Sequence, residues 1–175
     1  MPDAVTRFLS RLDALLARLD DQLALAATPH EVAWIVCEFT GRELNLADCV
    51  VYLPEGGDGL LQTAAWGTKR VAEHMLESRI HLSLGEGIVG DCARRLHTQR
   101  VDDTRNDPRY VRDDESNLSE LAVPIHHDEI LLGVLDSEHA ADGFYDARYE
   151  HAFEAIAERS AARLWGLRGE PVARP

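Results

Sequence analysis

This sequence of 175 residues lacks closely spaced cysteines, an excess of positive charge and any visible internal repeat. Cys37, Cys49 and Cys92 stand far apart, without the paired spacing of a metal site, and predict reduced thiols in a cytoplasm. The net charge of -13 argues against a nucleic-acid partner, because binding to phosphates depends on clustered Lys and Arg. Residues 1–26 carry Asp and Arg throughout, which excludes a signal peptide or a membrane span there.

The composition is that of one soluble globular domain. Hydrophobic residues make up 45% and charged residues 28% of the chain, and its length suffices for a core that folds alone. We expect three parts: an amphipathic, dimer-forming helix within residues 1–27, a domain over residues 28–167 that includes a C-terminal helix, and a flexible tail at residues 168–175.

Apolar residues recur at intervals of three and four in both terminal segments, which predicts helices over residues 3–26 and 146–167. Each helix either docks on the sheet of its own chain or pairs with a second copy. Two helices with such seams can form a dimeric four-helix bundle, so we expect a homodimer. The seams contain Val5, Phe8, Leu12, Leu15, Leu19 and Gln22 or Leu23 in the first helix, and Tyr149, Phe153, Ile156, Ser160, Arg163 or Leu164, and Leu167 in the second.

Capping and turn residues divide the first half of the domain. Thr28, Pro29 and Glu31 predict the start of a second helix. A strand over residues 48–53 is expected to break at Pro54. The elements expected after it are a hairpin turn at residues 55–59, a strand at 60–66, a helix at 69–79 and a strand at 80–84.

A glycine-rich stretch, Gly-Glu-Gly-Ile-Val-Gly, occupies residues 85–90. Its first two glycines permit a tight turn with positive φ, and the helix that follows should direct Ile88, Val89 and Cys92 toward the core. The stretch also matches the dinucleotide-binding pattern G-x-G-x-x-G, which requires a buried parallel strand before it and a βαβ unit around it. Here the preceding strand is short and the strands downstream lie at hairpin distance, which argues against a dinucleotide site.

Residues 103–116 form a long polar loop after a short strand at residues 99–102. A loop of this length inside a compact domain is usually functional or mobile. Asn-Asp-Pro at residues 106–108 predicts a turn, after which Tyr110 could fold back over a pocket as a lid. A solvated surface loop, with Tyr110 packed only for cover, is an equal alternative.

Two apolar strands, at residues 119–126 and 130–138, flank the polar turn His-Asp-Glu and predict an antiparallel hairpin. Both strands are mostly apolar on both faces, which predicts a sheet covered on both sides. Alternation places Leu132 on the same face as Val134. Pro124 has no N–H to donate, so one side of the first strand should be open or irregular there.

Glu120 and Asp136 each stand in one of these otherwise apolar strands. A buried carboxylate is costly unless it is paired, hydrogen-bonded or protonated. Three explanations stay open. The carboxylates accept backbone N–H groups from the adjacent loop or helix start, or they bind an amine or guanidinium of a ligand, or they pair locally with Arg100, Arg105 or Arg109 or with a metal.

The order of these features, with a glycine turn and helix, a polar loop and two apolar strands, resembles that of a GAF domain, the small-molecule sensory module of signalling proteins. The resemblance spans residues 28–165. It implies an α+β fold in which a six-stranded antiparallel sheet carries the terminal helices on one face. A short helix and a loop would cover a ligand pocket on the other face.

One catalytic branch of that family, the free methionine-R-sulfoxide reductases, permits a closer comparison. Their Ser-Glu-Ile-Val-Val-Pro motif is similar to Ser-Glu-Leu-Ala-Val-Pro at residues 119–124, so that its Glu would fall on Glu120. Their two substrate-binding acids would fall on Asp136 and Glu138. Their reaction needs one thiolate to attack the sulfoxide and a second thiol to resolve the product. Neither stands where the comparison requires it, so we expect no catalysis. The positions of their cysteines are occupied here by Arg79, Val89 and Asp113.

The resemblance therefore implies a non-catalytic sensor in bacterial cytoplasmic signalling. It would bind a small ligand, with an amine-bearing compound as one option, under the loop at residues 103–116, transmit occupancy through dimer helices, and act on a separate signalling protein. Two alternatives stay open. One is an enzyme of the reductase type with a degenerate site, and the other is a structural dimerisation module whose pocket is filled by Trp66, Tyr110 and their neighbours.

The cofactor is unknown, and haem or iron bound through His81, His97 or Cys92 has no support in the pattern. No catalytic or metal-binding residue is expected. The residues that we expect to bind the ligand are Tyr52, Trp66, Ile88, Val89, Cys92, Asp103, Asp107, Tyr110, Glu120, Asp136 and Glu138.

Overall fold

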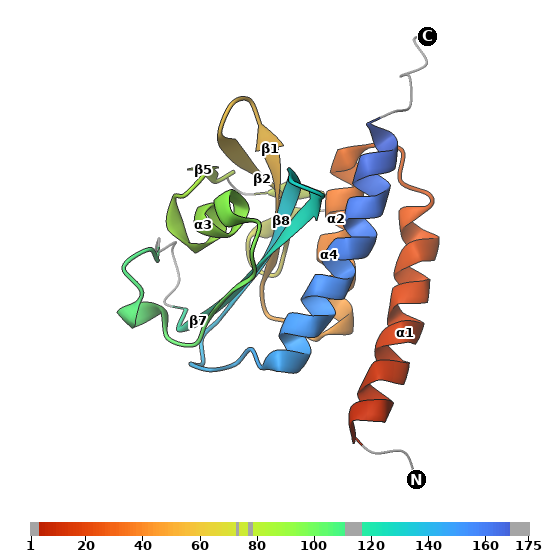
Figure 1. Cartoon of the computed structure of the whole chain (residues 1–175), viewed down its shortest axis with the longest axis horizontal. Coiled ribbons are helices and arrows are strands. Elements are labelled where there is room, and N and C mark those ends of the chain that lie inside the picture. Colours follow the sequence, from red (N-terminus) through yellow and green to blue (C-terminus); the bar gives the residue numbers. More distant parts are fainter. Residues whose placement is uncertain (1–3, 73, 77–78, 111–116, 169–175) are drawn as a thin grey trace.

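The computed structural model describes residues 4–72, 74–76, 79–110 and 117–168, and the elements within them are shown in Figure 1. The helices are α1 (Ala4–Leu23), α2 (Pro29–Glu43), α3 (Gly87–Arg95), α4 (Ala147–Leu167) and the 3-10 helix η1 (Thr104–Asn106), and the strands are β1 (Cys49–Glu55), β2 (Gly59–Trp66), β3 (Arg70–Ala72), β4 (Met75–Leu76), β5 (His81–Ser83), β6 (Gln99–Val101), β7 (Ser119–His127) and β8 (Ile130–His139).

Six strands form one antiparallel sheet in the order β5-β2-β1-β8-β7-β6, and β3 and β4 form a separate pair. The long strands β1 and β8 lie in the centre, and the three-residue strands β5 and β6 form the edges. This arrangement confirms the expected α+β class and its six-stranded antiparallel sheet.

Helices cover both faces of the sheet. Figure 1 shows α2 and α4 on one side with α1 outside them, and α3 on the opposite side. We call these the helix side and the cavity side. The larger apolar core lies on the helix side and includes Trp34 of α2 and Phe153 of α4. A smaller cluster under α3 includes Val50 and Ile88. The prediction of a sheet covered on both sides is therefore confirmed.

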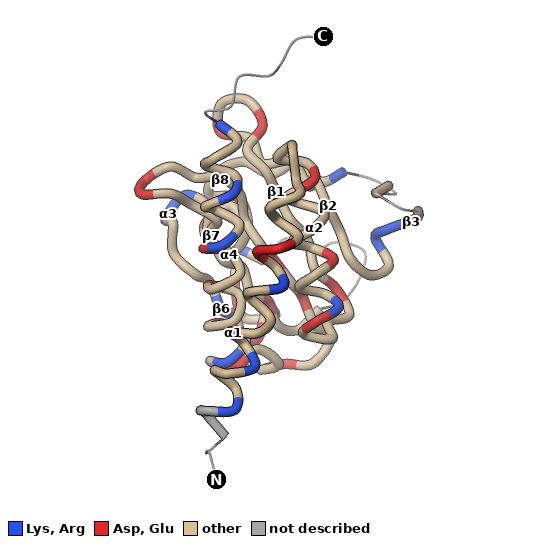
Figure 2. The backbone as a smooth tube through the Cα atoms, turned by 90° about the vertical axis from the view of Figure 1, so that its right-hand side faces the viewer, with Lys and Arg blue, Asp and Glu red and all other residues tan. Residues whose placement is uncertain are grey.

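The apolar seam of α1 is buried within the chain. Leu12, Leu16, Leu19 and Leu23 belong to the core that α1 shares with α2 and α4, so the helix docks on other helices, which in turn cover the sheet. Figure 2 shows this side of the molecule, where α1 carries acidic and basic residues. No helix within the described ranges is both long enough and apolar enough to cross a membrane.

Caps fix the starts of the two helices that pack on the sheet. The Thr28 hydroxyl accepts the N–H of Glu31 at 3.1 Å, and Pro29 opens α2. The Glu31 carboxylate accepts the N–H of Ala27 at 2.6 Å. In the usual capping box this carboxylate accepts the N–H of the cap residue itself, which here is Thr28, so the return bond reaches one residue further back. Asp146 caps α4 through its side chain.

The glycine-rich stretch forms the turn from β5 into α3. Gly85 has a φ of 91° and Gly87 a φ of 69°, which confirms the predicted positive values. A Cβ atom on Gly90 would lie 2.4 Å from the carbonyl oxygen of Ser83. This glycine therefore allows α3 to approach the end of β5.

The prediction of a helix over residues 69–79 is wrong. Within its described part, this segment forms the β3–β4 pair, with His74 at a φ of 53° in the turn. Arg70 donates to Glu38 of α2 at 2.6 Å, and the His74 ring stacks on that of Trp34 with centroids 4.8 Å apart. Contacts with α2 thus outweigh the local preference for a helix.

Two prolines lie in strands where one side has no strand partner among the described residues. β1 continues through Pro54, where a break was expected, because β8 pairs with β1 only as far as Tyr52. Pro124 lies in β7 beyond Ala122, where the pairing with β6 stops. The expected open side at Pro124 is confirmed, and both positions suit a residue without an N–H.

The register of the β7–β8 hairpin shifts between Ile125 and His126. This irregularity changes the face on which Leu132 lies. Leu132 packs in the helix-side core, whereas Val134 belongs to the cavity-side cluster. The expectation that both share one face is therefore wrong, because a bulge interrupts the alternation.

Candidate functional site

A cavity of about 50 Å³ lies on the cavity side of the sheet. Strands β1, β7 and β8 contribute its floor, while β5, the start of α3 and the segment after β2 supply the other walls. The lining residues are Tyr52, Lys69, Ile80, Leu82, Gly87, Ile88, Val89, Glu120, Asp136 and Glu138.

Three carboxyl groups meet at this cavity. Glu120 of β7 lies directly opposite Glu138 of β8, and Asp136 lies opposite Ala122. Because alternate residues of a strand point to the same face, all three acids share the cavity side. They are buried, with 4% exposure for Glu120 and Asp136 and 7% for Glu138. Like charges directly opposite each other in a ladder are destabilising, and burial adds a desolvation cost.

Burial raises the pKa of Glu120 well above its ordinary value, and the adjacent Asp136 and Glu138 raise it further. The Glu120 carboxyl group is therefore protonated at a pH at which an exposed glutamate would be charged. In that form its O–H can donate a hydrogen bond, and on losing the proton it becomes an acceptor.

Lys69 brings a positive charge to the same cavity. Its Nζ lies 3.3 Å from Oδ2 of Asp48 and 3.8 Å from Oε2 of Glu138. Asn117 donates from Nδ2 to the same Glu138 oxygen at 3.0 Å. The ammonium group opposes the rise in the pKa of Glu120, although burial outweighs it.

Two further titratable groups lie near these acids. Burial, followed by the charges of Asp136 and Glu120, raises the pKa values of the Tyr52 phenol and the Cys92 thiol. Cys92 is fully buried, and a thiol held in its protonated form is a poor nucleophile. The site thus offers charge and hydrogen bonds for binding, and its cysteine is not activated.

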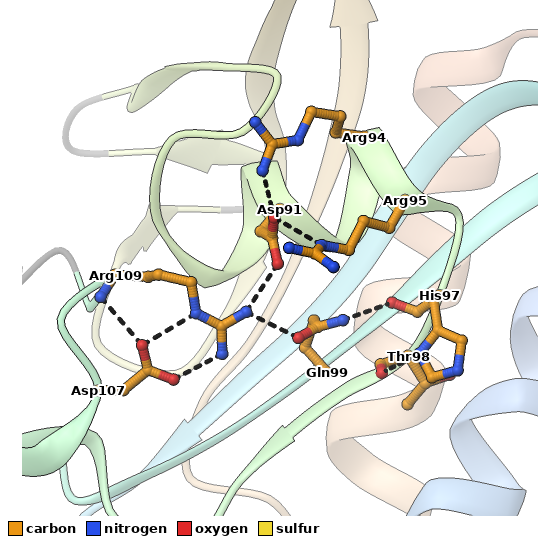
Figure 3. A network of polar contacts seen from close by, with 8 residues as sticks. All are labelled: Asp91, Arg94, Arg95, His97, Thr98, Gln99, Asp107 and Arg109. Carbon is orange, nitrogen blue, oxygen red and sulfur yellow. Dashed lines mark hydrogen bonds and ion pairs between the residues drawn. The ribbon is translucent and has the colours of Figure 1, made fainter.

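Beside the cavity, Asp91 of α3 accepts hydrogen bonds from three arginines (Figure 3). The distances are 2.6 Å from Arg94, 2.9 Å from Arg95 and 2.7 Å from Arg109. These hydrogen bonds, with that from Arg95 the largest contribution, lower the pKa of Asp91 to about 2 although the residue is buried. Asp91 is thus compensated by three guanidinium groups.

Arg109 fastens the loop after η1 to its surroundings. Its guanidinium group binds both carboxylate oxygens of Asp107 and donates to Oε1 of Gln99 in β6 at 2.9 Å. The next residue, Tyr110, is half-buried and packs against the cluster that contains Tyr52. Both interpretations of the loop predict this packing of Tyr110. Residues 111–116 of the predicted lid lie outside the described residues.

Most of the predicted ligand residues come together in space. Lys69 was missed because it was assigned to a helix, and Ile80, Leu82 and Gly87 were missed as well. The positive φ of 98° at Gly67 marks the turn that directs the chain at Lys69 toward the cavity, and the glycine itself was a usable signal. The predicted residues that lie in the lining or in its apolar cluster are Tyr52, Ile88, Val89, Cys92, Tyr110, Glu120, Asp136 and Glu138.

Trp66 lies on the helix side, away from the cavity. Its Nε1 donates to the carbonyl oxygen of Leu46 at 3.0 Å, and its ring lies over Gly41 of α2, where a Cβ atom would be 2.3 Å away. In β2 it shares a face with Ala64 of the helix-side core. The prediction that Trp66 binds the ligand is therefore wrong, because strand alternation directs its side chain to the face opposite the cavity.

Asp103 and Asp107 are also absent from the cavity lining. Each carboxylate binds the guanidinium group of the arginine two residues later, at 2.8 and 2.6 Å. Arg100 instead pairs with Glu150 at 2.6 Å. The arginines proposed as local partners for the strand acids are thus engaged elsewhere.

Within the described residues, no group of three or more His, Cys, Asp or Glu side chains is placed to hold a metal ion. His81 and His97 are exposed, whereas Cys92 is fully buried.

Comparison with known proteins agrees with this architecture. A family model described as GAF domain matches residues 26–163. The chain belongs to the GAF domain family. This GAF protein is similar to the GAF domain from an Acinetobacter phosphoenolpyruvate-protein phosphotransferase, with a TM-score of 0.77, 18% identity, and coverage of 94% of this chain and 98% of that chain.

Two other solved structures show the same likeness. The free methionine-R-sulfoxide reductase from Neisseria meningitidis, solved in complex with its substrate, has a TM-score of 0.76 and 18% identity, with 90% of each chain covered. A putative GAF sensor protein from Burkholderia vietnamiensis has a TM-score of 0.75 and 18% identity, with 93% of this chain and 99% of that chain covered. At this identity the likeness shows the fold alone. No curated protein sequence matches the GAF protein.

Proposed function

We propose that this GAF protein is a non-catalytic sensor of a small cytoplasmic molecule that carries an amine, and that the molecule binds in the cavity under α3. GAF domains often sense small molecules in signalling. The observation that carries the proposal is the convergence of Glu120, Asp136 and Glu138 on one buried cavity.

The chemistry of this site favours a cation. Buried carboxylates destabilise a fold unless positive charge or hydrogen-bond donors compensate them. An ammonium group supplies one positive charge and three donors within a small volume. Tyr52, Ile88 and Val89 add apolar surface to the same cavity, which suits the carbon skeleton of an organic amine.

Two observations support a binding role without catalysis. The cysteine positions of the sulfoxide reductases correspond to Arg79 and Val89 here, and to Asp113, which lies outside the described residues. Cys92 stands near the acids, but its raised pKa keeps it as a thiol. Without a thiolate, attack on a sulfoxide has no nucleophile at this residue.

The strand that carries two of the acids also contacts the helix side. Asp136 and Glu138 point to the cavity, so Ser137 between them points to the helices. Ser137 Oγ lies 2.7 Å from the hydroxyl oxygen of Tyr145 and also donates to the carbonyl oxygen of Asp48. Because Tyr145 immediately precedes the cap of α4, a ligand-induced shift of β8 would reach the start of that helix.

We propose that α4 and α1 carry this shift to a second copy of the chain in a homodimer, whose state a separate signalling protein detects. Leu9 of α1 and Trp165 of α4 support this role, because they are apolar residues that are 43% and 37% exposed on these two helices. The seam leucines are buried within the chain, so the dimer would use these other apolar positions.

The test is native mass spectrometry of the purified protein beside the same sample after denaturation. We expect an excess mass that disappears on denaturation, and a thermal shift with primary amines that the corresponding alcohols do not produce. Asp136→Asn and Glu138→Gln should abolish both effects, whereas the surface variant Glu129→Gln should keep them. A bare mass together with no thermal shift from any amine would contradict the proposed function.

A further inference from the structure

We infer that the ammonium group of Lys69 occupies the position of the ligand's ammonium, and that ligand binding exchanges one for the other. This inference rests on the proposed function. It adds a competitor for the site within the chain itself, and it restricts the ligand to compounds whose cation can replace that of a lysine.

Lys69 is the single lysine among the 18 Lys and Arg residues of the chain. At every other basic position the sequence has Arg, whose planar guanidinium group binds carboxylates with a fixed geometry. A lysine instead presents a compact charge with three donors on a flexible four-carbon stem. The one residue with the chemistry of a primary amine therefore lies beside the buried acids.

Two carboxylates lie near the ammonium group of Lys69. Its Nζ is 3.3 Å from Asp48 and 3.8 Å from Glu138, whereas charge-assisted N–H···O bonds measure about 2.7–2.9 Å. By comparison, Arg109 donates to Asp91 at 2.7 Å. These two contacts of Lys69 are thus longer than the contact between Arg109 and Asp91.

Glu120 is an independent indication of a missing ligand group. Its carboxyl group lines the cavity and is 4% exposed, yet it forms no hydrogen bond within the described residues. Buried polar groups in proteins are nearly always hydrogen-bonded. A ligand ammonium is not tethered to the chain, so it can contact Glu120 together with Asp136 and Glu138.

The cavity is too small for an organic ammonium ion of several carbons beside Lys69. Its volume is about 50 Å³ with Lys69 in place, and one water molecule takes up about 30 Å³ of the liquid. The lysine side chain is 26% exposed, so its flexible stem can carry the ammonium out to solvent. Departure of Lys69 therefore opens the space that the ligand fills.

Competition between Lys69 and the ligand for one site sets the apparent affinity of the protein for the ligand. A ligand that binds only when Lys69 has left the site is weakened by the fraction of time that the lysine is away. Removal of the lysine should therefore tighten the binding of a cation.

The first experiment removes the lysine and supplies its ammonium separately. Lys69→Ala removes three carbons and the ammonium group of the side chain, and n-butylammonium supplies the same charge on a chain one carbon longer than the part removed. We expect n-butylammonium chloride to raise the Tm of Lys69→Ala by several degrees more than that of the wild type. Sodium chloride and 1-butanol at equal concentrations serve as controls. Equal shifts in both proteins would overturn the inference.

Two further variants separate the charge from the space. Lys69→Met keeps most of the stem and removes the charge, so it should respond to n-butylammonium less than Lys69→Ala does. The double variant Lys69→Ala with Asp136→Asn should lose the response. A full response in the double variant would overturn the assignment of the site to the acid cavity.

The second experiment uses the wild-type protein. Because the chain has one lysine, side-chain acetylation by N-acetoxysuccinimide reports on Lys69 alone once peptide mapping separates it from the N-terminal amine. Methylguanidinium chloride, a cation that does not consume the reagent, should increase the acetylation rate of Lys69 as it displaces the lysine. It should not do so in Asp136→Asn. An unchanged rate at concentrations that shift the Tm would overturn the exchange.

These results distinguish the inference from the proposed function. A ligand retained by the wild type, with no change in Lys69 acetylation when that ligand is removed, would overturn the exchange and leave the sensor intact. If n-butylammonium raises the Tm of Lys69→Ala while the wild-type protein binds no amine, the position assigned to the ammonium group would be supported. The proposed sensor function would be contradicted.

Discussion

The two faces of the sheet are both buried, but the helix side buries an apolar core and the cavity side buries charge. Phe153 and Leu121 are 0% exposed in the continuous core beneath α2 and α4. On the opposite face, Glu120 and Asp136 are almost as deeply buried around a cavity. The same two strands, β7 and β8, supply both faces through alternate residues.

This difference places stabilising and destabilising burial within the same strands. Burial of apolar side chains on the helix side stabilises the fold. Burial of acids on the cavity side costs stability, and the fold retains that cost where a cation can offset it. Substitutions on the two faces should therefore have opposite effects, and the predictions below test that contrast.

The largest effect is expected on the helix side. Phe153→Ala removes a fully buried ring and should lower the free energy of unfolding by about 3–5 kcal/mol, because the lost contacts leave a cavity. Urea denaturation measures the change. The matched control is Leu25→Ala at an 84% exposed position, which should change stability by less than about 0.5 kcal/mol. An equally small change in Phe153→Ala would contradict the claim that the helix-side core stabilises the fold.

Asp91 sharpens the comparison because it is a buried acid on the cavity side that is fully paired. Asp91→Asn should lower the free energy of unfolding at pH 7 by about 1–2 kcal/mol, a range reduced because the arginines are partly exposed. The pKa is lowered from 3.8 to about 2, so this contribution is complete above 3.8 and is lost as the pH falls through about 2. Denaturation at pH 7 and pH 2 should show a difference that disappears in acid, and Asp58→Asn should show none.

Glu120 should behave in the opposite sense. Its pKa in the folded protein is raised above the ordinary 4.5, so its contribution to stability is complete below 4.5 and is lost as the pH rises through the folded value. Glu120→Gln keeps a neutral side chain of the same shape, so it should stabilise the protein at pH 8 and flatten the loss of stability with pH. Thermal unfolding between pH 5 and pH 8 tests this, with Glu129→Gln as the surface control. If Glu120→Gln is less stable than the wild type at pH 8, burial of this carboxyl group on the cavity side does not cost stability.

The smallest effect concerns the link between the two faces. Tyr145→Phe removes the hydroxyl group that contacts Ser137 and should cost about 0.5–1.5 kcal/mol. If this contact conveys occupancy, the variant should still bind n-butylammonium in the Lys69→Ala background, while amide hydrogen exchange at the start of α4 no longer responds. The control is Tyr149→Phe in the first turn of α4. A full response of α4 in Tyr145→Phe would exclude this route.

Much of the fold could be predicted because local chemistry decided it. The Thr28 cap, the positive φ values at Gly85 and Gly87, and the apolar faces of β7 and β8 depend on nearby residues. The segment around Lys69 could not be predicted in the same way. It is held by contacts of Arg70 with α2, more than thirty positions away.

The site shows the same limit. Glu120 and Asp136 could be selected because a charge within an apolar strand is conspicuous, and Ile88 follows from the helix after the glycines. Trp66 was misplaced because a strand read alone does not reveal which of its two faces meets which layer of helices. Lys69 was missed because its partners lie far away in the sequence, before β1 and in β8, and the sequence alone does not show that proximity.

Pro124 has a consequence for how copies of this protein meet. Beyond Ala122, β7 lies past the short edge strand β6, and such a strand is a template on which another chain could add its own strand. A proline at this point denies the incoming strand one N–H donor and interrupts the ladder after a few residues. The edge is thereby protected against sheet extension and aggregation.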